Sequence, residues 1–225
     1  MNRLIFILFL VGILAIGGGA AWYLVDTRNE AFGPPIVATS TPQVEEGLAI
    51  YSNGPYGFTI FYSQDAEVLY TFDANYGLSR NWRVNALPNT EGAPIVSITP
   101  YHTESEDSYP RYFSATVRIG ASADPAEVKR CEAASSGQGE TVLPDAIIGN
   151  TPWKVFAFES AGMMQYVKGV SYRTIHEGRC IALEKIRTGS SYREAASSEK
   201  DISEEVLSKE YETLSSIVES FSFAR

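Results

Sequence analysis

Histidine and cysteine are scarce in this sequence, which contains two of each among 225 residues. His102 and His176 do not form an HExxH motif, and no Gly-x-Ser-x-Gly turn is present to expose a nucleophilic serine. A structural zinc site would need a full set of histidine or cysteine ligands, which the chain cannot supply if its cysteines pair with each other. We therefore predict no catalytic residue, no metal site and no cofactor, and we do not expect an enzyme.

An excess of positive charge is also missing. The chain has 18 Lys and Arg against 27 Asp and Glu, a net charge of −9. Nucleic-acid binders need a basic surface to contact phosphates, so nucleic acid is excluded as a partner. The composition, 44% hydrophobic and 12% aromatic, excludes an intrinsically disordered chain.

Charge is absent from residues 4–25 altogether. As a helix this run would span about 33 Å, which is enough for a hydrocarbon core of about 30 Å. Arg3 precedes the run, and Asp26 and Arg28 follow it. The positive-inside rule therefore places the N-terminus in the cytoplasm and the rest of the chain on the other side of the membrane.

Two interpretations of this segment remain open. A signal peptide would be cleaved after Ala20 or Ala21, which would give a secreted protein. A retained single-pass anchor would instead place Trp22 and Tyr23 at the outer headgroup level. We favour the anchor, and we assign residues 1–28 to a signal-anchor or transmembrane segment in the cell membrane.

Both interpretations bring Cys131 and Cys180 into an oxidising compartment. Two cysteines allow one intramolecular pairing, and closing a loop of about 50 residues would stabilise the fold by roughly 4 kcal/mol in the chain-entropy model. The alternative is a pair of buried free thiols. We predict the disulfide, because oxidation is expected outside the cytoplasm.

Residues 29–48 contain Pro34 and Pro35 and have no sustained apolar period, which is typical of an extended tether. Residues 49–225 suit one domain. Several of its segments alternate apolar and polar residues with short turns between them, which predicts a mostly antiparallel sheet. The expected strands are Tyr56–Tyr62, Glu67–Phe72, Trp82–Leu87, Ile95–Tyr101, Tyr112–Ile119, Pro152–Glu159, Met164–Ile175 and Cys180–Ile186.

Two helices are expected among these strands. The first begins with Asp124 as its cap and Pro125 in its first turn, and Glu127 is placed to reach back to the cap. Cys131 should face the core on this helix. The second begins at Asp201 and carries an apolar stripe at helical spacing, formed by Val206, Leu207, Tyr211, Leu214, Ile217 and Val218. The fold class is therefore α+β, with one transmembrane helix before it.

Two segments resemble a known family. Tyr51–Tyr62 is similar to the opening hairpin of PsbP-like exported domains, and Leu214–Phe223 is similar to their last helix and final strand. The segment Gly162–Arg173, flanked by the two cysteines, resembles uncharacterised membrane-anchored bacterial proteins of that fold. The resemblance implies an antiparallel sheet packed by helices and an exported domain, and it implies no activity.

Aromatic side chains offer a possible interaction surface, since aromatic residues dominate interface hot spots. The alternative is that most of them belong to the core. The candidates are Trp82, Tyr101, Tyr109, Tyr112 and Trp153.

The preferred hypothesis is a non-catalytic, extracytoplasmic domain of the cell envelope, held at the membrane by its N-terminal helix and binding or assembling with an envelope protein. An exported hydrolase with an unrecognised nucleophile is one alternative. Another is a small-ligand or Ca²⁺ binding protein that uses the acidic loop with Glu104, Glu106 and Asp107.

Overall fold

The computed structural model of the chain describes residues 47–74, 78–102, 113–135, 139–162, 165–190 and 203–224. All of them belong to the unit Val44–Arg225. The predicted anchor and nearly all of the predicted tether lie outside the described residues. Among the residues that are described, no helix is long and apolar enough to cross a membrane.

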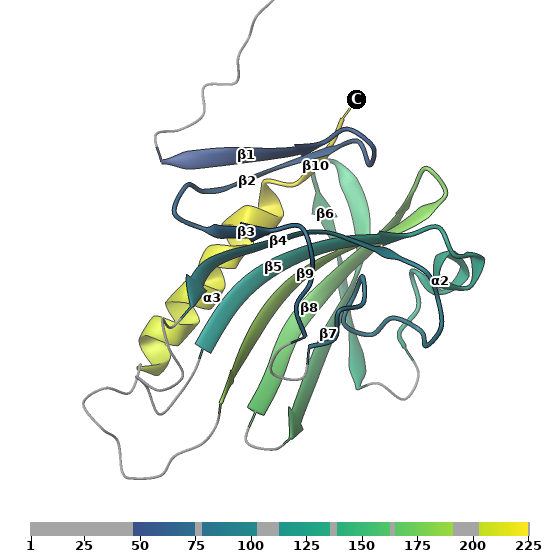
Figure 1. Cartoon of the computed structure of the whole chain (residues 1–225). Coiled ribbons are helices and arrows are strands. Elements are labelled where there is room, and N and C mark those ends of the chain that lie inside the picture. Colours follow the sequence, from purple (N-terminus) through teal and green to yellow (C-terminus); the bar gives the residue numbers. More distant parts are fainter. Residues whose placement is uncertain are drawn as a thin grey trace, which may run out of the picture. The chain divides into compact units, whose positions relative to one another are not determined.

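The described residues form two antiparallel sheets (Figure 1), which confirms the mostly antiparallel fold predicted from the sequence. The small sheet consists of β1 (Leu48–Asn53), β2 (Phe58–Ser63) and β10 (Ser222–Phe223), with β2 in the centre. The large sheet has the spatial order β3 (Glu67–Leu69), β4 (Ala93–His102), β5 (Phe113–Ser122), β9 (Arg179–Ser190), β8 (Gln165–His176), β7 (Thr151–Gly162) and β6 (Glu140–Ile148).

Tight turns set the register of the hairpins on one side of the large sheet. Glu177 and Gly178 join β8 to β9 with φ of 49° and 74°, and Gly149 and Asn150 join β6 to β7 with φ of 56° and 67°. Positive φ at both central residues is the geometry that matches the right-handed twist of paired strands. The turn predicted at Glu177-Gly178 is confirmed.

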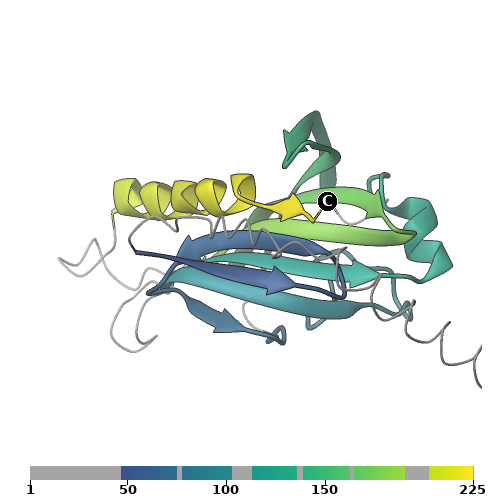
Figure 2. The same ribbon diagram turned by 90° about the horizontal axis from the view of Figure 1, so that it is seen from above.

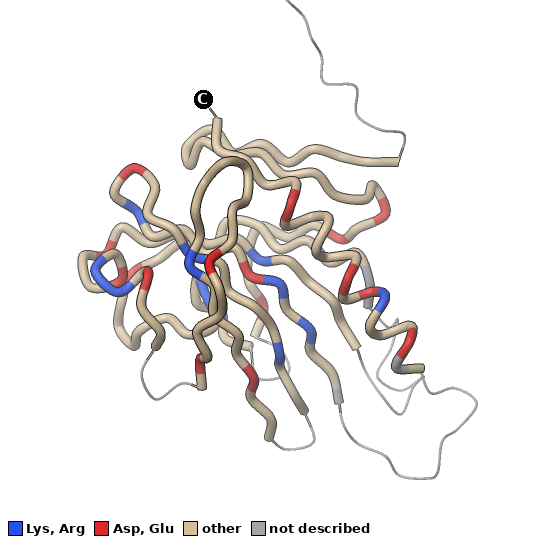
Figure 3. The backbone as a smooth tube through the Cα atoms, turned by 180° about the vertical axis from the view of Figure 1, so that it is seen from behind, with Lys and Arg blue, Asp and Glu red and all other residues tan. Residues whose placement is uncertain are grey.

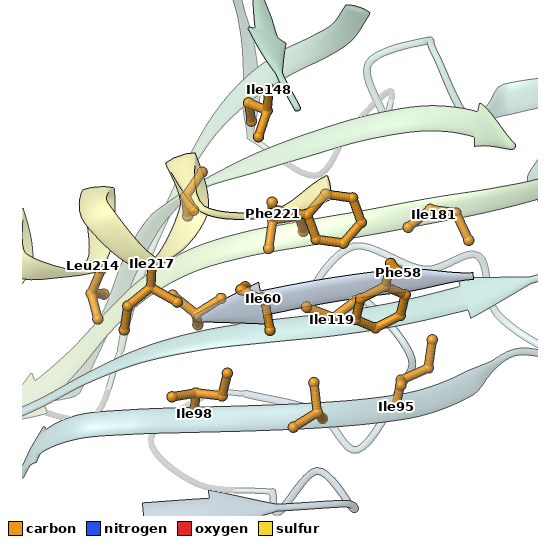
Figure 4. Packing of buried hydrophobic residues seen from close by; sticks show 14 of the residues in the cluster. Phe58, Ile60, Ile95, Ile98, Ile119, Ile148, Ile181, Leu214, Ile217 and Phe221 are labelled. Carbon is orange, nitrogen blue, oxygen red and sulfur yellow. The ribbon is translucent and has the colours of Figure 1, made fainter. Parts of the chain in front are cut away.

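One face of the large sheet packs against α3 (Glu204–Glu219) and against the small sheet. The helix runs roughly along the strands in both ribbon views (Figure 1, Figure 2). Phe58 and Ile60 of β2 and Phe221 after α3 meet Ile119 of β5 in this core (Figure 4). Burial of these side chains is the main stabilising contribution on this face.

The apolar stripe predicted for the last helix is largely confirmed. Leu207, Leu214, Ile217 and Val218 are buried, whereas Val206 is 40% exposed and lies outside the stripe. The helix begins after Ser203, whose hydroxyl accepts a hydrogen bond from the Val206 N–H at 3.3 Å. Asp201, the predicted cap, lies outside the described residues.

The first helix, α2 (Pro125–Arg130), begins as predicted. The Asp124 carboxylate accepts a hydrogen bond from the Ala126 N–H at 2.8 Å, and Pro125 occupies the first turn. Glu127 does not reach back to the cap, because its carboxylate is buried and bonded to another segment. Cys131 is fully buried and forms a disulfide with Cys180 of β9.

The segment between β3 and β4, residues 70–92, covers the other face of the large sheet. Trp82–Leu87, predicted as a strand, forms bends and turns here, so this prediction is wrong. The segment approaches β5 so closely that a Cβ on Gly120 would lie 1.9 Å from the Trp82 carbonyl oxygen. Glycine is therefore needed at position 120 for the backbone of the covering segment to reach the sheet.

Candidate functional site

The face of the sheet under residues 70–92 is polar, unlike the face under α3. Along β5 the residues Ala115, Val117 and Ile119 belong to the hydrophobic core, while Thr116 and Arg118 point to the opposite side. The register aligns this polar row across neighbouring strands, because Arg118 pairs with Ser97 of β4 and with Glu184 of β9. A layer of buried polar side chains therefore lies between the sheet and its cover.

Arg118 is 6% exposed and anchors the covering segment to this layer. Its guanidinium donates hydrogen bonds to the carbonyl oxygens of Asp73 at 3.0 Å and Ser79 at 3.2 Å. It also lies over the Phe72 ring, 4.8 Å from its centre. Its Nε is buried and has no hydrogen-bond partner among the described residues. Burial lowers the pKa of Arg118, although Glu184 and Asp73 oppose this shift.

A network of buried ion pairs extends the polar layer toward α2. Arg83 of the covering segment pairs with Glu127 of α2 at 2.7 Å, and the Arg83 guanidinium lies 4.0 Å from Glu140 of β6. Arg173 of β8 donates a hydrogen bond to the same Glu140 carboxylate. These four side chains are at most 1% exposed, so the charges compensate one another away from water.

The carboxylates of this network also bind the backbone of the cover. Glu127 accepts hydrogen bonds from the Leu87 N–H at 2.6 Å and from the Thr90 hydroxyl at 2.8 Å. Glu184 accepts from the Val84 N–H at 3.0 Å, and Glu140 accepts from the Ser135 N–H at 2.7 Å. The buried glutamates therefore take the place of a neighbouring strand for the backbone of residues 84–87.

Burial and charge compete at each glutamate of the network. Burial alone would raise the pKa of Glu127 and of Glu140, but hydrogen bonds and charge from Arg83 and Arg173 outweigh it, and both pKa values lie below 4.5. At Glu184 burial prevails over the charges of Arg173 and Arg83, and its pKa is raised.

These shifts predict an acid-sensitive fold. Below pH 4.5 the unfolded chain takes up protons at positions 127 and 140 before the folded chain does, so the free energy of unfolding should fall as the pH is lowered further. Glu184 acts oppositely between pH 4.5 and its raised pKa, where stability decreases as the pH rises. Urea unfolding at a series of pH values measures both limbs. Glu127→Gln should reduce the acid slope by up to about 1.4 kcal/mol per pH unit, and an unchanged slope would contradict the assignment.

The polar layer opens into a pocket of about 150 Å³ at the end of the sheet away from α2. Its floor comes from β4, β5 and β9 and includes the buried Arg118, and its rim comes from β3 and the chain that follows it. The lining residues are Glu67, Leu69, Thr71, Asp73, Leu78, Ser97, Thr99, Ser114, Thr116, Arg118 and Thr188.

A larger hollow, about 690 Å³, lies where the start of α2 meets the ends of β4 and β5. Its charged side chains are already engaged by the protein. Arg179 donates to the Pro55 carbonyl oxygen at 3.2 Å and lies over the Tyr56 ring, and Asp124 caps α2. We therefore regard the smaller polar pocket as the candidate site.

Only part of the predicted aromatic surface can be placed. Trp82 and Trp153 are 2% and 1% exposed, so the prediction that they line an interaction surface is wrong. Trp82 packs near the disulfide, and Trp153 packs in the core against Phe221. Tyr109, Tyr112 and the side chain of Tyr101 lie outside the described residues, as do Glu104, Glu106 and Asp107.

The predicted disulfide is present and lies beside the ionic network, because Cys131 directly follows α2. His176 stacks on Phe223 with ring centres 3.7 Å apart. In the described part of the chain, no group of three or more His, Cys, Asp or Glu side chains is placed to hold a metal ion. Acidic positions recur along α3 (Figure 3), in keeping with the net negative charge.

Sequence reasoning missed the ionic network. Arg83 was assigned to a strand and Glu127 to a capping role, and Arg173 was noted only within the family resemblance. One signal was available: Arg118 and Glu184 each fall on the polar side of otherwise apolar strands.

Comparison with known proteins gives two solved structures with similar chain arrangement. The first is the cyanobacterial PsbP protein (CyanoP) of Synechocystis, with 11% identity and a TM-score of 0.38 over 81% of this chain and 95% of that one. The second is LpqN, involved in cell envelope biogenesis of Mycobacterium tuberculosis, with 7% identity and a TM-score of 0.36 over 62% of this chain and 82% of that one.

The likeness concerns the fold alone. The resemblance to PsbP-like domains predicted from Tyr51–Tyr62 and Leu214–Phe223 is matched by the PsbP structure at that level. No protein-family model matches the sequence, and no curated protein matches it either.

Proposed function

We propose that this chain is an extracytoplasmic domain, held at the membrane by residues 1–28, which binds a partner or ligand of the cell envelope without converting it chemically. The observation that carries the proposal is the disulfide between Cys131 and Cys180. Structural disulfides form and persist in oxidising compartments, and the uncharged run of residues 4–25 supplies the means of export.

The buried ionic network supports a binding rather than a catalytic role. Its three glutamates accept hydrogen bonds from backbone N–H groups or from arginines, so these carboxylates serve to fix the cover on the sheet. A general acid or base must instead reach a substrate atom. The scaffold around the polar pocket is thereby rigid, which lowers the entropic cost of binding.

A reporter fusion tests the location. Alkaline phosphatase, which folds only where disulfides form, is joined after Arg225 and expressed in bacteria with the full-length chain. We expect an active fusion in the membrane fraction, with Cys131 and Cys180 resistant to thiol alkylation. Deleting residues 1–28 should leave the fusion inactive and both thiols reactive.

The same material distinguishes the anchor from a signal peptide. An intact N-terminus in the membrane fraction agrees with the proposal. An N-terminus at Ala21 or Trp22 in the soluble exported fraction would overturn the anchor and leave export standing. An inactive fusion of the full-length chain would overturn export itself.

A further inference from the structure

The polar pocket is lined mainly by hydroxyl groups. Six of its eleven lining residues are serine or threonine, drawn from the chain after β3 and from β4, β5 and β9: Thr71, Ser97, Thr99, Ser114, Thr116 and Thr188. A hydroxyl both donates and accepts hydrogen bonds, so such a lining suits ligands that do the same.

Thr116 links the hydroxyls of the pocket floor. Its Oγ1 lies 3.0 Å from the hydroxyl of Thr99 and 3.2 Å from that of Ser114. The three hydroxyls carry three hydrogens and six lone pairs, and these two bonds use two of each, so one donor and four acceptor sites are left. The floor therefore offers both kinds of partner within a short distance.

The charges of the pocket disfavour an anion. Arg118 contributes one positive charge, whereas Glu67 and Asp73 contribute two negative ones, so the lining has a net charge of −1. The Arg118 guanidinium already donates to two carbonyl oxygens of the cover, and its buried Nε has no partner among the described residues. A neutral oxygen acceptor would satisfy that donor without bringing a second negative charge beside the two carboxylates.

Apolar surface completes the lining. Leu69 and Leu78 border the pocket, and Leu78 is buried while Leu69 is partly exposed. A sugar ring presents C–H groups on its faces and hydroxyls around its edge, so it can contact both kinds of surface. The volume of about 150 Å³ has room for one such ring rather than for an oligosaccharide.

From these observations we propose that the pocket binds one neutral, polyhydroxylated group, such as a single sugar residue or a cyclic polyol. This inference deepens the proposed function, on which it rests in taking the domain to be a binding domain. The hydroxyls of Ser97 and Thr116 would share hydrogen bonds with ligand hydroxyls, and the carboxylates of Glu67 and Asp73 would accept from them.

The test uses the full-length chain in a polyoxyethylene detergent, which carries no sugar. Methyl glucoside, methyl N-acetylglucosaminide and myo-inositol are the probes, each at roughly 100 mM, well above a millimolar dissociation constant. Saturation-transfer NMR reports contact and titration reports affinity. Sodium phosphate, sodium acetate and calcium chloride are tested in parallel.

Thr116→Val and Ser97→Ala remove single pocket hydroxyls and keep similar shapes. The double variant should weaken binding of the preferred probe by roughly tenfold or more. Thr174→Val is the matched control, because Thr174 is a buried strand threonine that does not line the pocket. It should bind like the unmodified chain, and near-ultraviolet circular dichroism checks that all variants are folded.

The possible outcomes separate this inference from the proposed function. Binding of a polyol that is lost in the double variant and kept in Thr174→Val supports the pocket assignment. It is overturned if no polyol binds, if the double variant binds undiminished, or if only phosphate, acetate or calcium binds. Release of methanol from a bound methyl glycoside would instead contradict the non-catalytic role and leave the pocket standing.

Discussion

Replacing Arg173 with methionine should lower the free energy of unfolding by about 3–5 kcal/mol, the range measured when one partner of a buried ion pair is removed. Arg173 is fully buried and donates hydrogen bonds to the Glu140 carboxylate, to the Ser171 hydroxyl at 3.0 Å and to the Ala133 carbonyl oxygen at 3.3 Å. Methionine can retain the packing against Phe156, but it leaves Glu140 charged and buried with one cation fewer.

An exposed ion pair of the same sheet gives the control. Lys154 lies 2.7 Å from Asp145, and both side chains are exposed, so Lys154→Met should change stability by less than about 1 kcal/mol. Urea unfolding at neutral pH measures both variants. Equal effects of the two substitutions would show that the Arg173 pair is not buried in the folded chain as described.

A second variant separates the pair from the rest of the site. Adding Glu140→Gln to Arg173→Met removes the uncompensated charge, although the hydrogen bonds from Asn85 and the Ser135 N–H now meet an amide. The double variant should therefore be more stable than the sum of the single effects by about 0.5–3 kcal/mol. Strict additivity would contradict direct coupling between the two side chains.

Period-two alternation made most of the large sheet predictable from the sequence. In β5, apolar and polar residues alternate because one side faces the core and the other faces the polar layer. The strand β6 was not predicted, because Pro144 and Asp145 interrupt it. An edge strand tolerates a proline, since one row of its N–H groups needs no partner in the sheet, and β6 has a register shift at this point.

The incorrect strand at Trp82–Leu87 has a different cause. Its composition fits a strand, and its backbone does need hydrogen-bond acceptors. Those acceptors are the carboxylates of Glu184 and Glu127, which bind the N–H groups of Val84 and Leu87 in place of a neighbouring strand. Local sequence carries no sign of this substitution, because the two glutamates lie 100 and 40 positions away along the chain.

The candidate site was predictable only in fragments for the same reason. The alternation in β5 indicates that Thr116 and Arg118 share a side, but it does not indicate what covers them. The pocket exists because the chain after β3 folds back over that side, with the Asp73 and Ser79 carbonyls bound to Arg118. Long-range contacts of this kind are set by tertiary structure, and a periodic pattern leaves them open.

Removing the disulfide is the second substitution with a large expected effect. The link closes a loop with a sequence separation of 49 residues, and the chain-entropy model gives a loss of about 4 kcal/mol for such a loop. Cys131→Ala combined with Cys180→Ala is the suitable variant. Both positions are fully buried beside Trp82, Ala86 and Ala182, where a serine hydroxyl would be left without a partner.

The loss should also have a local signature, because the disulfide ties α2 to β9 and α2 holds the cover through Glu127. Without the link, amide hydrogen exchange at Val84 and Leu87 should accelerate more than exchange at Ile119 in the main core. Dithiothreitol should destabilise the unmodified chain and leave the alanine variant unaffected, which separates disulfide reduction from other effects of the reagent. An alanine variant as stable as the unmodified chain, with unchanged exchange at both amides, would mean that the ionic network holds the cover in place without the covalent link.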